Sequence, residues 1–277
     1  MRHLVVRMLT AGLCLNACIS QADEEQRMDK PDQEADRTAF ERAKQGEWRE
    51  VFFDPGTENW QEKWFLDGEI ASVRNTRDGM QLTAGPQFGN DAHHMVLWTK
   101  DSFEGDLKIE FEFTRLDFES DAVNIIYIQA TGVGEEPYLK DIAEWSELRR
   151  VPSMREYFGN MHTFHISYAA FPNQPDERDG YIRGRRYMPE NGRLAGTTLS
   201  PEYFPPAELF APGIPHQMTV IKRGKNLLMR VERPNLTYYC HMSNPELPAV
   251  TEGRVGLRQM FTRSARYKNF RISVLEE

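Results

Sequence analysis

The chain contains few cysteines. Only three of its 277 residues are cysteine, and two of these, Cys14 and Cys18, lie close to the N-terminus. Cys240 is the one remaining thiol, which excludes a disulfide framework in the rest of the chain. With 40% hydrophobic residues, a chain of this length can fold around a core without such cross-links.

Several catalytic signatures are also missing. No P-loop occurs, and Gly132-Val133-Gly134 lacks the third glycine of a dinucleotide fingerprint. The chain has no G-x-S-x-G turn, no H-E-x-x-H pair and no paired C-x-x-C. These absences argue against nucleotide chemistry and serine hydrolysis, and we expect neither a cofactor nor a bound metal ion.

Positive charge is in deficit, because 34 lysines and arginines stand against 42 acidic residues and the formal net charge is −8. An acidic protein is poorly suited to bind nucleic acid or an anionic membrane surface, so we expect no nucleic-acid partner. The arginines at 183, 185 and 186 form a local exception.

The N-terminus has the pattern of a signal peptide. Its apolar run, residues 4–15, is too short to span a bilayer comfortably, and Arg2 and Arg7 flank and enter it. The run ends in Leu15-Asn16-Ala17-Cys18, which resembles the lipobox of bacterial lipoproteins.

The lipobox resemblance implies cleavage before Cys18 and a lipid on its thiol, which would be the only contact with a membrane. The alternative is a secretory signal cut at Ala17 or Ala22. Neither Ile19 nor Ser20 is the aspartate of a retention signal, so we expect a lipid-anchored protein of the cell envelope, at the outer membrane.

Composition divides the chain into three parts. Residues 1–17 form the predicted lipoprotein signal peptide. Residues 18–46 are polar and predict a tether, with a short helix over 37–45. Residues 47–277 form the predicted globular domain.

The pattern of the globular part is mainly that of β-strands. Strict alternation over residues 108–113 predicts a half-buried strand, and the apolar run over 124–130 predicts a strand buried on both faces. Further strands are predicted over residues 162–171, 217–222, 226–232, 253–260 and 267–275. One helical insertion is predicted over 141–150. We therefore predict an all-β, two-sheet antiparallel jelly-roll sandwich.

Four segments carry a family resemblance. They are His94-Met95-Val96-Leu97-Trp98, Phe164-His165-Ile166-Ser167-Tyr168, Gly253-Arg254-Val255-Gly256-Leu257-Arg258-Gln259-Met260 and Tyr267-Lys268-Asn269-Phe270-Arg271-Ile272. Together they resemble the YesU-like bacterial domains of unknown function in the concanavalin A-like lectin/glucanase superfamily. The resemblance implies a jelly roll whose concave face holds sugar, often in a setting of polysaccharide degradation. This chain departs from the family by its tether and by an insertion over residues 173–199.

The resemblance favours His165 and Tyr168 as catalytic residues. Arg258 lies in one of the four matching segments, which makes it a third candidate. In a polysaccharide lyase, a neutral histidine can remove the proton beside a uronate carboxylate, a tyrosine can protonate the leaving oxygen, and an arginine can neutralise the carboxylate. On a flat strand, His165 and Tyr168 point to opposite faces, so they meet only if a bulge or loop intervenes. The alternative is a histidine satisfied within the core.

Further residues are candidates for saccharide binding. Their side chains can stack on a sugar ring or donate and accept hydrogen bonds. They are His94, Trp98, Gln129, His162, Arg183 and Arg185. For each, a core or solvent-facing structural role is the alternative.

These patterns predict an extracytoplasmic protein that recognises a polysaccharide or its oligosaccharides and that can cleave a uronic-acid glycan by β-elimination. One alternative is a glycan-binding lipoprotein without catalysis. Another is a glycoside hydrolase using Glu110 and Glu112, two carboxylates on one strand face.

Overall fold

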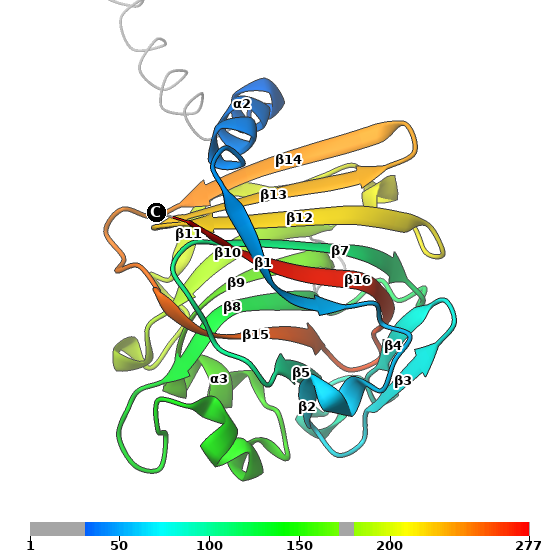
Figure 1. Cartoon of the computed structure of the whole chain (residues 1–277). Coiled ribbons are helices and arrows are strands. Elements are labelled where there is room, and N and C mark those ends of the chain that lie inside the picture. Colours follow the sequence, from blue (N-terminus) through cyan, green and yellow to red (C-terminus); the bar gives the residue numbers. More distant parts are fainter. Residues whose placement is uncertain (1–30, 172–179, 277) are drawn as a thin grey trace, which may run out of the picture. The chain divides into compact units, whose positions relative to one another are not determined.

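The computed structural model describes residues 31–171 and 180–276 (Figure 1). The predicted signal peptide, Cys18 and the first part of the predicted tether lie outside the described residues. The remainder consists mostly of antiparallel strands.

The strands form two layers, sheet 1 and sheet 2. Sheet 1 contains β1 (Trp48–Asp54), β3 (Ser72–Thr76), β4 (Gly79–Thr83), β7 (Leu107–Arg115), β12 (Pro215–Arg223), β13 (Asn226–Arg233), β14 (Leu236–Ser243) and β16 (Ser264–Leu275). Sheet 2 runs in the order β2 (Trp64–Asp67), β5 (Met95–Thr99), β15 (Glu252–Gln259), β8 (Asn124–Gly132), β9 (Met161–Ala170), β10 (Tyr181–Tyr187) and β11 (Thr198–Tyr203). Strand β11 also pairs with β14 through Ser200 and Ser243, which joins the two sheets at one edge. The short β6 (Phe103–Glu104) pairs with β15.

The main core lies between the two sheets and follows from the strand patterns. In β7, the alternating residues Ile109, Phe111 and Phe113 are buried in this core, while the charged residues between them are partly exposed. Strand β8 is buried on both faces, with Ile126 in the main core and Tyr127 in a second cluster on the other side. The predicted two-sheet jelly roll is therefore confirmed.

The second cluster lies on the outer face of sheet 2, the face turned away from sheet 1. It is covered by the segment between β8 and β9, drawn in green in Figure 1, which holds η3 (Ile142–Arg149) and α3 (Met154–Asn160). The predicted helical insertion is present as the 3₁₀ helix η3, and α3 follows it after a cap at Ser153. We call residues 142–160 the covering segment.

Two boundaries differ from the prediction. The helix α2 (Gln33–Ala43) is not part of a free tether, because Phe40 packs against Ile221 and Leu228 on the outer face of sheet 1. The predicted insertion over residues 173–199 contains β10, which lies between β9 and β11 within sheet 2. Arg183 and Arg185 therefore lie on a strand of sheet 2.

The remaining helical turns are single short elements at connections between strands. They are η1 (Trp60–Glu62), η2 (Asp91–His93), η4 (Pro189–Asn191) and η5 (Ala207–Phe210). Among the described residues, no helix is both long enough and apolar enough to cross a lipid bilayer.

Candidate functional site

Five neighbouring strands of sheet 2 pair in register, and their outward-facing residues form rows across its outer face. One row across the sheet runs through Trp98, Gly256, Tyr127, His165 and Arg185, each paired with the next. Because all five are directly opposite their neighbours, the four that carry a side chain project it to the same face. The row places three of the predicted site residues together.

A second row lies two residues further along the same strands. It runs through Val96, Arg258, Ile125, Ser167 and Arg183. The sheet thus presents three arginines, one histidine and one serine on a single face, although they come from β9, β10 and β15.

His165 is hydrogen-bonded on both sides of its ring. Its Nδ1 lies 2.8 Å from the hydroxyl of Tyr187, and its Nε2 lies 3.3 Å from Ser167 Oγ. Burial lowers the pKa of His165 well below its usual value, and the charges of Arg185 and Arg183 lower it further. The imidazole is therefore neutral at physiological pH.

Tyr187 is a site residue that was absent from the predicted set. It lies on β10 with the same parity as Arg183 and Arg185, so the alternation of that strand carries the signal. Burial raises the pKa of Tyr187, which keeps its phenol protonated beside His165.

Tyr168 does not belong to this site. Its side chain lies on the opposite face of β9, in the core between the sheets, where its hydroxyl is 2.8 Å from that of Tyr267. No bulge brings it to His165, since the pairing of β9 with β8 stays regular from Asn124 to Ile128. The prediction that Tyr168 acts with His165 is wrong, because strand parity separates them.

Of the three arginines of β10, Arg186 is buried, and Arg183 and Arg185 are half-buried. Arg183 forms an ion pair with Glu202, with 2.5 Å between Nε and Oε1, and its guanidinium lies over the Tyr181 ring. Arg185 donates through Nη1 to the hydroxyls of Thr197 and Thr198. Burial lowers the pKa of Arg185, and the neighbouring charge of Arg183 acts in the same direction.

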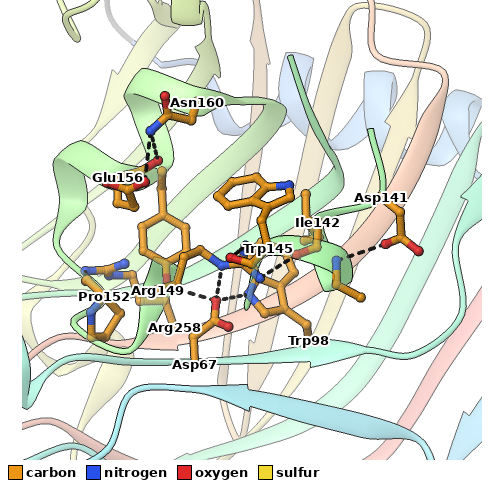
Figure 2. Close-up of polar contacts among 12 residues, drawn as sticks. Asp67, Trp98, Asp141, Ile142, Trp145, Arg149, Pro152, Glu156, Asn160 and Arg258 are labelled. Carbon is orange, nitrogen blue, oxygen red and sulfur yellow. Dashed lines mark hydrogen bonds and ion pairs between the residues drawn. The ribbon is translucent and has the colours of Figure 1, made fainter. Parts of the chain in front are cut away.

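Beneath the covering segment, Asp67 of β2 collects three donors on its Oδ2 atom (Figure 2). They are Arg149 Nε at 2.6 Å, Trp98 Nε1 at 2.7 Å and the Tyr157 hydroxyl at 3.0 Å. Trp98 is fully buried and stacks on Tyr127 and Tyr157. The predicted stacking surface of Trp98 is therefore covered by protein in this structure.

His94 and Arg258 are in direct contact. Arg258 Nη2 donates to His94 Nδ1 over 2.7 Å and to the carbonyl of Pro152 over 2.7 Å. Burial lowers the pKa of His94 to about 3, and the charge of Arg258 acts in the same direction. His94 is therefore neutral, and both residues lie under the covering segment.

Gln129 and His162 do not line this face. Gln129 has a positive φ of 58° at a bulge in β8, and its amide donates to the carbonyls of Phe103, Gly105 and Thr251. The bulge interrupts the alternation of β8 after Ile128, so Gln129 does not continue the face on which Tyr127 lies. His162 lies on the other face of β9 from His165, with its Nδ1 3.5 Å from Arg186 Nη2. Both predictions are corrected by the local backbone.

The two carboxylates of the predicted hydrolase alternative lie outside this face of sheet 2. Glu110 and Glu112 lie on β7 of sheet 1, where Glu110 pairs with Lys108 at 3.1 Å. Within residues 31–171 and 180–276, no three His, Cys, Asp or Glu side chains gather closely enough to hold a metal ion.

The described strands define a two-sheet antiparallel jelly roll. The chain belongs to the family described as a domain of unknown function, DUF1961, whose model matches residues 56–272. No curated protein matches the chain.

Solved structures share the fold at low sequence identity. A galectin-like protein of unknown function from Bacillus subtilis is 18% identical, with a TM-score of 0.63 over 84% of this chain and 99% of that one. A legume lectin-like domain from Entamoeba histolytica is 9% identical, with a TM-score of 0.52 over 78% and 92%. A lectin from Griffonia simplicifolia is 10% identical, with a TM-score of 0.52 over 81% and 99%.

Proposed function

We propose that this protein binds an acidic saccharide on the outer face of sheet 2. The observation that carries the proposal is the pair Arg183 and Arg185, half-buried on β10 and in register with Ser167 and His165 on β9. In a chain with a net charge of −8, two adjacent cations beside neutral hydrogen-bonding groups favour a ligand that carries both carboxylates and hydroxyls.

The charge balance of Arg185 supports this ligand. Among the described residues, no carboxylate oxygen lies within 4.0 Å of its guanidinium, and its partners are hydroxyl and carbonyl groups. An arginine positioned by neutral groups keeps its full charge for a ligand. Arg183, by contrast, shares its charge with Glu202.

Two finer assignments belong to the same proposal. We propose that the chain is a YesU-like member of the lectin-like superfamily, supported by the four quoted segments. The lipobox ending in Cys18 supports a lipid anchor at the cell envelope, in the outer membrane. The fold shared with the Griffonia simplicifolia lectin supports saccharide recognition.

Calorimetric titration of the full-length protein in detergent tests the binding function. Oligomers of galacturonate, alginate and glycosaminoglycans serve as ligands. The Arg185→Ala variant should bind its preferred ligand about tenfold to a hundredfold more weakly, the loss expected for one charge-assisted hydrogen bond. Arg271→Ala is the control, because Arg271 lies on β16 of sheet 1 and pairs with Glu50. Equal affinity in the two variants contradicts the proposed site.

A second candidate function is cleavage of the same ligand by β-elimination. The 2.8 Å contact between His165 Nδ1 and the Tyr187 hydroxyl supports it, because an imidazole and a phenol are groups that can take and give a proton in such a reaction. His165 would remove the proton beside the uronate carboxylate, and Tyr187 would protonate the leaving oxygen as the carbon–oxygen bond breaks. Absorbance of unsaturated uronates during incubation measures this reaction. Binding without that absorbance identifies a binding protein that does not cleave.

A further inference from the structure

Three arginines of the described residues are fully buried, and they differ in how their charge is balanced. Arg149 lies 2.6 Å from Asp67, and Arg263 lies 3.1 Å from Asp117. For Arg258, no described carboxylate is within ion-pair distance, and its charge is buried without a counter-charge.

The hydrogen bonds of Arg258 are also incomplete. Only Nη2 has partners, namely His94 Nδ1 and the Pro152 carbonyl. Its Nε and Nη1 atoms are buried and make no hydrogen bond within the part of the chain that the structure describes. Two donor atoms of the guanidinium, with three N–H groups between them, therefore have no partner among the described residues.

His94 supplies a third unused donor. His94 Nδ1 lies 2.7 Å from Arg258 Nη2 and 3.3 Å from the Pro152 carbonyl. Because the shorter contact is to a group that can only donate, it places the proton of the neutral ring on Nε2. That Nε2 atom is buried and has no partner among the described residues. The Phe261 ring stacks on the imidazole at 4.6 Å and fixes its orientation.

Such an arrangement is unfavourable in an empty protein. A buried charge is normally paired, and a buried donor is normally hydrogen-bonded, because each loses its interactions with water. The chain balances Arg149 and Arg263 with aspartates in direct contact. At Arg258, Asp91 Oδ1 lies 3.6 Å from His94 Nδ1, but no described carboxylate contacts the guanidinium itself, and this difference calls for an explanation. An anionic ligand supplies the missing charge and accepts the free hydrogen bonds.

Pro152 and Tyr157 of the covering segment both contact Arg258. The Tyr157 ring lies over the Arg258 guanidinium at 4.8 Å, and its hydroxyl is held by Asp67. The Pro152 carbonyl occupies one side of the same guanidinium. A ligand reaches Arg258 when Tyr157 moves aside.

We propose that Arg258 and His94 form a subsite for the carboxylate of a uronic acid residue, beneath the covering segment. This rests on the proposed saccharide binding and names its substrate class. Arg258 and Arg183 lie in the same row with β8 and β9 between their strands, which separates them by about 14 Å at the usual strand spacing. A ligand that contacts both is therefore an oligosaccharide, with one acidic residue at each end.

Free galacturonate is the probe that distinguishes the subsite from the β10 arginines, because a single sugar cannot reach both. Its binding is followed by calorimetry and by the rise in melting temperature, with galactose and acetate as controls. We expect wild type and Arg271→Ala, which changes an exposed ion pair on sheet 1, to bind galacturonate more tightly than either control ligand. Arg258→Gln should lose about tenfold to a hundredfold in affinity for galacturonate, as expected for a charge-assisted hydrogen bond.

The opposite pattern, with loss in Arg185→Ala and none in Arg258→Gln, overturns the subsite and leaves the proposed function standing. If only oligomers bind, an unchanged oligomer affinity in Arg258→Gln also overturns it. If no saccharide binds wild type, both proposals fail. Equal binding of acetate and galacturonate would show that the site takes any small carboxylate and overturns the sugar assignment.

Stability separates the proposed role from a structural one. Arg263→Gln is the matched control, because it removes an equally buried arginine that has a carboxylate partner. We expect Arg263→Gln to lower the melting temperature strongly and Arg258→Gln to change it little. If Arg258→Gln does not fold, Tyr157→Ala keeps Arg258 and should speed galacturonate association. An unchanged association rate then contradicts the proposal.

Discussion

Arg149 and Asp67 form an ion pair in which both side chains are fully buried, with 2.6 Å between Arg149 Nε and Asp67 Oδ2. Arg149 comes from the covering segment and Asp67 from β2 of sheet 2. The same Asp67 oxygen accepts from Tyr157, so one carboxylate holds both helical parts of the segment. The cover over Arg258 therefore depends on a residue that does not itself contact Arg258.

Asp67→Asn tests this dependence. The substitution leaves the Arg149 charge buried without a partner, so we expect a loss of about 3–5 kcal/mol in the free energy of unfolding. Urea unfolding measures the loss. The control is Glu50→Gln, which removes the partner of Arg271 in an exposed pair and should cost about 1 kcal/mol or less. Similar losses in both variants would show that the buried pair does not stabilise the fold.

His94 predicts a dependence of stability on pH. Its pKa is lowered from 6.5 to about 3 in the folded protein, so between these values the unfolded chain binds the proton more readily. The contribution of neutral His94 to the free energy of unfolding is complete above pH 6.5. Below this pH it decreases by about 1.4 kcal/mol for each pH unit. Unfolding of wild type and His94→Gln at several pH values measures the difference. If the unfolding free energy of both proteins changes equally with pH below pH 6.5, the prediction is wrong.

Gln129 is expected to contribute to stability and not to binding. Its amide donates to three backbone carbonyls that the Gln129→Ala variant would leave without that donor. We expect a loss of about 1–3 kcal/mol in unfolding free energy with unchanged saccharide affinity. Chemical denaturation and calorimetry check the two parts separately. A loss of saccharide affinity in a folded Gln129→Ala variant would show that Gln129 does contribute to binding.

The two tyrosines considered as partners of His165 should behave differently. Tyr168→Phe removes one buried hydrogen bond, to Tyr267, and should cost about 1 kcal/mol without a change in saccharide affinity. Tyr187→Phe removes the partner of His165 Nδ1 and should weaken ligand binding, and also any elimination activity. Both variants keep the ring, so packing is preserved. Reduced binding in Tyr168→Phe alone would contradict the geometry.

The alternation of apolar and polar residues is sufficient to predict most of the strands. The strict pattern in β7 and the apolar run in β8 depend only on which faces are buried, and both match the structure. The same parity separates His165 from Tyr168. These properties are local, and a single strand contains all the information that they need.

The buried polar contacts could not be predicted in this way. Asp67 and Arg149 are 82 residues apart, and nothing near either residue indicates its partner. Gln129 was misplaced because a bulge with positive φ changes the parity of β8 within the strand. A matching segment is enough to select Arg258 as a candidate site residue. That no carboxylate contacts it can be seen only in the three-dimensional structure.

The helix α2 affects how the protein behaves in solution. It lies outside the family-matched residues 56–272, yet Phe40 shields Ile221 and Leu228 on sheet 1. A version of the protein trimmed to begin at Trp48 would leave these apolar side chains facing water. Exposed apolar patches on a flat sheet promote self-association. Solubility and freedom from aggregation therefore depend on eleven residues that the family boundary leaves out.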